Sequence, residues 1–320
     1  MPTTLSCTVF RVKKLLAVAL LALPLASCDT LDVIGPRPNA ELISLAQQAS
    51  ADGQVLGDAP LAQIREFQSS QLFDEAQRLC GTTESGEVPS TCEFERGPGE
   101  ATGNAEPGTA ASLAVDALTQ AAEDVPEESV TLLVAQAIDL QASDAFAALD
   151  EGSGDASVGD LDALTDTLRE AEDDNSDDMT GGASATADDE SESPLVTDDA
   201  DLELARTMLR EEYAAQYGFG MASSFADDPT AARLDALRDA SDTRARTLIA
   251  ALEPSGDVPD AAPGYEFEGV PAPSDPASAG AYAQAQQQAL VDQWRATAAR
   301  AKSPQFRHIA ITLAANAQRA

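Results

Sequence analysis

The chain has 320 residues and a formal net charge of −36, because 55 acidic residues face only 19 basic ones. This excess of negative charge disfavours nucleic acid and anionic membrane surfaces as binding partners. The sequence has a single histidine, His308, and neither a P-loop nor a dinucleotide-binding glycine pattern. These features disfavour histidine-dependent catalysis and nucleotide-driven chemistry.

The first 27 residues have the layout of a signal peptide. Three basic residues precede an apolar run, LLAVALLALPL, at 15–25. This run is too short to span a bilayer, which takes about 20 apolar residues. The tetrapeptide Leu-Ala-Ser-Cys at 25–28 resembles the bacterial lipobox at all four positions. The resemblance implies cleavage before Cys28 and a lipid on its thiol.

Lipid on Cys28 would place the protein in the cell envelope, anchored to a membrane on the exported side. Each buried CH₂ of such an anchor contributes about 0.8 kcal/mol to membrane binding. Residues 28–38 then form a short tether. The membrane, reached through this lipid, is the expected partner, together with envelope proteins that the sequence does not identify.

The acidic residues are spread along the chain rather than confined to one tract. Together with the scarcity of lysine and an aromatic content of 4%, this composition resembles that of proteins from extreme halophiles. In molar salt the Debye length falls to about 3 Å, which removes most of the self-repulsion of a charged chain. We therefore expect a protein that is folded in molar salt and loosens at low ionic strength.

Cys80 and Cys92 bracket a polar loop rich in Gly, Ser, Thr and Pro. In an oxidising envelope such a pair predicts a disulfide, and closing a loop of this size stabilises a protein by about 3 kcal/mol. A zinc site is the alternative, but two cysteines without a nearby histidine cannot complete a tetrahedral shell.

Residues 39–150 are predicted to form an N-terminal helical domain, because apolar residues recur there at helical spacing. Two prolines, Pro60 and Pro126, stand at helix starts, where proline is favoured. The domain forms either a second bundle or a part of the C-terminal one. Helices are expected at 40–49, 61–80, 110–123 and 129–149.

From Glu170 to Asp201 the chain has many acidic residues, no basic residue and few large apolar ones. Such a stretch cannot bury enough apolar surface to offset the entropy lost on ordering. We expect 151–201 to be an acidic, largely disordered linker.

Residues 202–320 are predicted to hold four helices that form a bundle. Asp-Pro and Ser-Pro steps at 228–229, 275–276 and 303–304 combine a capping side chain with a first-turn proline. The helices are expected at 202–225, 228–252, 274–301 and from 304 onward.

Two stretches of this region resemble an uncharacterised family of ferritin-like domains from bacterial envelope proteins. The stretch 212–220, EYAAQYGFG, is similar to the family pattern Glu-His-Ala-Ala-x-Tyr-x-Tyr-Gly. The second stretch runs from Tyr265 through Phe267 to Ser-Asp-Pro-Ala-Ser-Ala at 274–279 and resembles a Tyr-rich segment followed by Asp-Pro-Ala-Ser-Ala. The resemblance covers 202–320 and implies a ferritin-like four-helix bundle.

The chain departs from ferritin-like di-iron proteins at the metal ligands. Those sites take inward Glu residues and Glu-x-x-His pairs. Here Tyr213 replaces the histidine after Glu212, the second helix carries Ser241 and Asp242 but no histidine, and His308 lies in no Glu-x-x-His context. A histidine-ligated di-iron centre cannot be assembled. Glu212 remains the candidate for a buried acid or metal ligand, and a surface carboxylate is the alternative.

The sequence therefore predicts an all-α envelope lipoprotein in which a non-catalytic ferritin-like bundle has a structural or interaction role. We expect no catalytic residue and no cofactor. The alternative is a metal-binding or di-metal oxidoreductase-type ferritin-like protein with a carboxylate site near Glu212.

Overall fold

The computed structural model describes residues 35–101, 106–144, 146, 161–178, 196–266 and 271–320. Cys28 and the predicted signal peptide lie outside these residues. The described parts contain helices and no strand, which confirms the all-α prediction. The α-helices are α2 (Ala40–Leu56), α3 (Pro60–Cys80), α4 (Pro107–Ala121), α5 (Glu127–Gln141), α7 (Leu161–Asp178), α8 (Asp199–Ser223), α9 (Asp228–Leu252), α10 (Pro276–Arg300) and α11 (Pro304–Arg319), and two 3₁₀ turns are η1 (Ser90–Cys92) and η2 (Glu253–Ser255).

Short polar side chains fix where most of these helices begin. Asp227, Asp275 and Ser303 each accept a hydrogen bond from a backbone N–H in the first turn of the helix that follows, and each is followed by proline within two residues. Asp275 and Ser278 form a reciprocal capping box. These contacts satisfy N–H groups that have no partner inside the helix.

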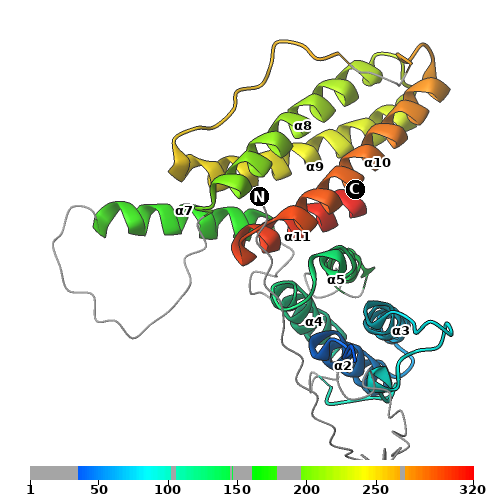
Figure 1. Ribbon diagram of the computed structural model, residues 1–320. Coiled ribbons are helices and arrows are strands. Elements are labelled where there is room, and N and C mark those ends of the chain that lie inside the picture. Colours follow the sequence, from blue (N-terminus) through cyan, green and yellow to red (C-terminus); the bar gives the residue numbers. More distant parts are fainter. Residues whose placement is uncertain (1–34, 102–105, 145, 147–160, 179–195, 267–270) are drawn as a thin grey trace, which may run out of the picture.

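Helices α2 to α5, here called the N-terminal helix group, form two hairpins that pack together (Figure 1). α2 pairs with α3, α4 pairs with α5, and α2 also contacts α4. At Gly53 of α2 a Cβ would lie 3.3 Å from the carbonyl oxygen of Ala62 on α3, so glycine permits the close approach of these helices. Cys80 and Cys92 tie the end of α3 to η1 through the predicted disulfide, with the sulfurs at bonding distance.

Helices α8 to α11, here called the C-terminal helix group, also form two hairpins, α8–α9 and α10–α11 (Figure 1). The described part of the connection that follows η2, residues 256–266, runs back beside α8 (Figure 1). Arg206 near the start of α8 donates to the carbonyl oxygen of Asp257, and the ring of Tyr217 lies 5.5 Å from that of Tyr265. α8 and α10 are in contact, so the two hairpins pack into one unit.

The two helix groups share one continuous apolar core. α5 packs against α10 and α11, and α4 against α11. The amide of Gln141 on α5 donates to the hydroxyl of Thr312 on α11 at 3.1 Å, and both side chains are buried. Of the two arrangements that the sequence left open, the structure favours N-terminal helices that extend the core of the C-terminal ones.

The segment 151–201, expected to be a largely disordered linker, contains helix α7, so the expectation was wrong for 161–178. Leu161, Thr165 and Leu168 lie on one face of α7 and are buried. α7 packs on α9, where the hydroxyls of Thr165 and Thr247 are 2.8 Å apart. This apolar stripe precedes the most acidic part of the segment. The average composition of 151–201 therefore hides it. Residues 151–160 and 179–195 lie outside the described residues.

Helix α5 ends at Gln141, earlier than the predicted helix at 129–149. Ser143 interrupts it because its hydroxyl accepts the N–H of Phe146 and donates to the carbonyl oxygen of Leu140, a side-chain arrangement that competes with helix continuation. Phe146 is buried. None of the helices within the described ranges is long and apolar enough to cross a membrane.

Candidate functional site

Glu212, the acid singled out by the sequence, lies near the middle of α8 and is completely buried. Its carboxylate accepts hydrogen bonds from three side chains. Arg244 of α9 donates from Nε to Oε1 at 2.7 Å and from Nη2 to Oε2 at 3.1 Å. Ser241 donates to Oε2 at 2.5 Å, and Trp294 Nε1 donates to Oε1 at 2.7 Å. Both carboxylate oxygens therefore already have two donors each.

The arginine in this cluster is as buried as the glutamate. Neither the Arg244 nor the Glu212 side chain has measurable solvent exposure. Arg244 Nη1 also donates to Oδ1 of Asn316 on α11 at 3.0 Å. We call Glu212, Ser241, Arg244, Trp294 and Asn316 the central cluster. Its members come from α8, α9, α10 and α11, so one polar network joins every helix of the C-terminal helix group.

The central cluster follows from helical spacing. Ser241 and Arg244 are three residues apart on α9 and therefore face the same way. A bidentate arginine–carboxylate contact is planar and charge-assisted, and it is stronger than a neutral hydrogen bond. Tryptophan buries a large ring while its N–H finds an acceptor. The cluster thus compensates the desolvation of one positive and one negative group.

Sequence reasoning located Glu212 but missed its partners. It noted Ser241 only because a histidine was absent there, and it assigned no role to Arg244, Trp294 or Asn316. Two signals were present: Arg244 is three residues after Ser241 in a helix, and Trp294 is the only tryptophan of the chain. Neither signal identifies Glu212 as the shared partner, because the three helices meet only in the fold.

The geometry of the central cluster does not suit a metal ion. A cation bound to Glu212 would have to displace donors that already occupy both oxygens. Within the described ranges no group of three or more His, Cys, Asp or Glu side chains is placed to hold a metal. The carboxylate is therefore matched to a guanidinium inside the protein.

The two stretches that carry the ferritin-like resemblance meet in space. Tyr217 from the first contacts Tyr265 from the second, and Tyr217 is 45% exposed. Tyr213 is partly buried, and burial raises the pKa of its hydroxyl, with a smaller contribution from Asp260. The Asp-Pro-Ala-Ser part of the second stretch, 275–278, is the capping box of α10. Tyr217 and Tyr265 thus join the two stretches, and Asp275 and Ser278 cap α10.

The N-terminal helix group holds a second buried ion pair. Arg65 of α3 donates to Oδ2 of Asp52 on α2, with Nη2 at 2.9 Å, and donates to Gln68 at 2.7 Å. Burial lowers the pKa of Arg65, and the charge of Asp52 opposes this shift. The side-chain amide of Gln68 donates a hydrogen bond to the carbonyl oxygen of Gln136, so the network reaches α5. This arrangement is a structural link between helices.

Asp201 forms a third buried contact, between the start of α8 and the turn that joins α10 to α11. Its carboxylate accepts the backbone N–H groups of Lys302 and Ser303 at 2.8 Å each, and the Ser303 hydroxyl at 2.6 Å. The contact fixes the turn from which α11 starts.

Comparisons of the chain with protein-family models, with curated proteins and with solved structures found no match.

Proposed function

We propose that this protein is a lipid-anchored cell-envelope protein whose C-terminal helix group is a ferritin-like four-helix bundle with a structural or interaction role and no catalytic activity. The central cluster carries this proposal. In it Arg244 supplies the positive charge that a metal ion supplies in a di-metal bundle, and Ser241 and Trp294 take up the remaining carboxylate sites of Glu212.

The order and connection of the helices support the ferritin-like assignment. Four-helix bundles of this class have two helical hairpins joined by one long crossover connection. Here the hairpins α8–α9 and α10–α11 are separated by a connection whose described part after η2, residues 256–266, returns beside α8 (Figure 1). Di-metal members of the class place inward carboxylates in the bundle core, and Glu212 lies inward on α8.

The second candidate, a metal-binding or di-metal oxidoreductase-type protein with a site near Glu212, receives less support. The carboxylate is inward and buried, as such a site requires. However, its four hydrogen bonds leave no free oxygen position for a metal, and α9 presents Ser241 and Arg244 instead of ligands.

Elemental analysis of the purified full chain, prepared in high salt without chelator, separates the two candidates. The proposal predicts no stoichiometric iron, manganese or zinc in the wild type and in the Glu212→Gln variant. Near-stoichiometric metal in the wild type that disappears in Glu212→Gln would establish the metal site.

The lipid anchor rests on the lipobox resemblance at 25–28 and is tested separately. A Cys28→Ser variant should lose incorporation of labelled fatty acid and should move from the membrane fraction to the soluble exported fraction. Wild-type protein without lipid label would refute the anchor. This result would leave the scaffold proposal for the helix groups unaffected.

Adaptation to high salt is a further part of the proposal. Many acidic residues but only 16 basic ones follow the predicted signal peptide. Screening in molar salt would weaken their repulsion. Far-UV circular dichroism should show melting at a lower temperature in low salt than in molar salt, whereas equal melting temperatures would refute this part.

A further inference from the structure

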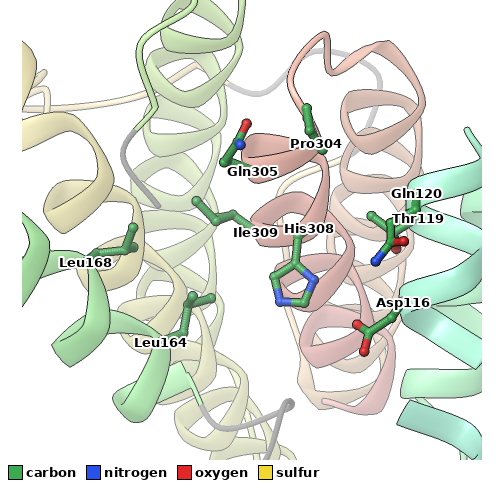
Figure 2. A pocket seen from close by; sticks show the side chains of 9 residues that line it. All are labelled: Asp116, Thr119, Gln120, Leu164, Leu168, Pro304, Gln305, His308 and Ile309. Atoms are coloured by element: carbon green, nitrogen blue, oxygen red, sulfur yellow. The ribbon is translucent and has the colours of Figure 1, made fainter. Parts of the chain in front are cut away.

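A pocket of about 280 Å³ lies where the two helix groups and α7 meet (Figure 2). It takes residues from three elements that are far apart in the chain: α4, α7 and α11. The central cluster contributes nothing to it. The lining residues are Asp116, Thr119, Gln120, Leu164, Leu168, Pro304, Gln305, His308 and Ile309.

The lining has an apolar side and a polar side. Leu164 and Leu168 of α7 form one wall, and Ile309 of α11 adjoins it. Asp116 of α4 stands on the opposite side, and the imidazole of His308 lies between the two walls (Figure 2). An apolar wall that faces a few polar groups is the usual composition of a small-molecule site.

Asp116 and His308 are the two titratable groups of the lining. Burial lowers the pKa of His308, and the charge of Asp116 only partly offsets this effect, so the imidazole is neutral near pH 7. Burial raises the pKa of Asp116, and His308 opposes this shift. Within the described ranges the Asp116 carboxylate makes no hydrogen bond or salt bridge to another side chain, so it is available to a ligand in the pocket.

We propose that this pocket binds a small organic cation, namely a primary amine with a compact apolar body. The ammonium group would lie against the Asp116 carboxylate, and the apolar body would lie against Leu164 and Leu168.

Other ligand classes fit the lining less well. An anion would meet the Asp116 carboxylate without a cationic partner among the lining residues. A zinc ion takes three or four protein ligands, and the lining offers one imidazole and one carboxylate. A neutral apolar molecule would leave the carboxylate uncompensated.

Because His308 is the only histidine of the chain, its NMR signal reports on this pocket alone. The test uses tag-free full chain labelled with ¹³C at histidine Cε1, in salt that keeps it folded at pH 7.5. Benzylamine is the probe. Benzyl alcohol keeps its ring without the charge, and methylammonium keeps the charge without the ring. We expect a saturable shift of the His308 signal with benzylamine, a weaker response to methylammonium and little response to benzyl alcohol.

Two variants and one matched control sharpen the test. Asp116→Asn should weaken benzylamine binding by about tenfold or more, as the loss of a hydrogen bond to a charged group does. Asp124→Asn removes an exposed charge just beyond α4 and should leave binding unchanged. Leu164→Ala trims the apolar wall and should weaken benzylamine, but not methylammonium, by about fivefold to tenfold.

The proposal is overturned if benzylamine produces no saturable shift, or if benzyl alcohol binds equally well. Unchanged binding in Asp116→Asn would also overturn it. If Asp116→Asn lost the native emission of Trp294, the variant would be misfolded and Leu164→Ala would provide the test. An equal loss of benzylamine and methylammonium binding in Leu164→Ala, or no loss of either, would contradict a site that combines charge and apolar contact.

Discussion

In the C-terminal helix group the buried pair Glu212–Arg244 draws donors and acceptors from all four helices, whereas in the N-terminal helix group the buried pair Asp52–Arg65 connects α2 to α3. Gln68 then extends the second network to α5 through a neutral hydrogen bond. Both pairs are almost completely removed from solvent.

The difference shows what a buried ion pair can contribute to a helical protein. Its formation gains little net stability, because desolvation offsets the attraction between the charges. Removal of one partner lowers the free energy of unfolding strongly, because the other charge remains buried. When the network touches four helices, as at Glu212, it also selects one arrangement of those helices. At Asp52 the ion pair connects the two helices of one hairpin, and a neutral hydrogen bond from Gln68 links it to α5.

The largest effect is expected for Arg244→Met, which leaves Glu212 buried without its cation. The free energy of unfolding should fall by about 3–5 kcal/mol. Urea denaturation followed by the fluorescence of Trp294, the only tryptophan, reports this loss in the C-terminal helix group. The exposed Arg246→Met on the same helix is the control and should cost at most about 1 kcal/mol.

A double variant sharpens that result. Glu212→Leu combined with Arg244→Met removes both charges and should recover much of the lost stability, because apolar groups of similar volume can replace a buried ion pair. A double variant as unstable as Arg244→Met would show that the unpaired carboxylate is not the source of the loss.

Arg65→Met is expected to cost about 3 kcal/mol, because Asp52 would stay buried without its cation. The loss should be concentrated in the N-terminal helix group. Far-UV circular dichroism, which follows all helices, should therefore shift more than the Trp294 transition. Equal shifts of both signals would contradict the distinction between the two networks.

Reduction of the disulfide, or its replacement by Cys80→Ser with Cys92→Ser, should lower stability by about 2–3 kcal/mol, because the unfolded chain regains the entropy of an open loop. The bond closes a loop beside α3, far in sequence from Trp294. The circular dichroism transition should move, and the Trp294 transition should move less. Unchanged denaturation by either signal would argue against a stabilising role for the bond.

Ser241→Ala should cost about 1–2 kcal/mol, because the hydroxyl is one of the donors to a buried carboxylate that keeps its arginine and tryptophan. The Trp294 urea transition measures it. Thr243→Ala, on the more exposed side of the same helix, should change the value by no more than about 0.5 kcal/mol. A cost as large as that of Arg244→Met would mean that the hydroxyl has a role beyond hydrogen bonding.

The smallest effect concerns His308 and pH. Because burial lowers its pKa in the folded state, the unfolded chain takes up the proton first as the pH falls. Stability from the neutral imidazole is present above about pH 6.5 and is lost below it. Between pH 7.5 and 5.5 the wild type should lose more stability, or gain less, than His308→Gln. Identical pH dependence of the two urea midpoints would contradict this.

The helix starts were predictable because their causes are local. Asp228-Pro229, Asp275-Pro276 and Ser303-Pro304 each combine a cap or first-turn acid with proline, and the helices α9, α10 and α11 begin there. Helix α7 was not predicted because the three buried residues of its packed face, Leu161, Thr165 and Leu168, are outnumbered by acidic residues in the composition of the segment.

The networks could not be predicted from sequence. Arg244 and Arg65 are ordinary basic residues of amphipathic helices until the fold sets them beside a buried acid. The same holds for His308, whose neighbour Asp116 is nearly two hundred residues away in the chain. Spacing within one helix identifies a face, but it does not identify the residues that meet that face.

The most direct test of the central claim uses Trp294, because its N–H donates to the carboxylate of Glu212 itself. The purified full chain is titrated with Mn²⁺ and Co²⁺ in high salt while the tryptophan emission is recorded. We predict no saturable quenching, because Arg244 already occupies the carboxylate. Saturable quenching near one equivalent that disappears in Glu212→Gln would contradict the account and place a metal ion at the centre of the bundle.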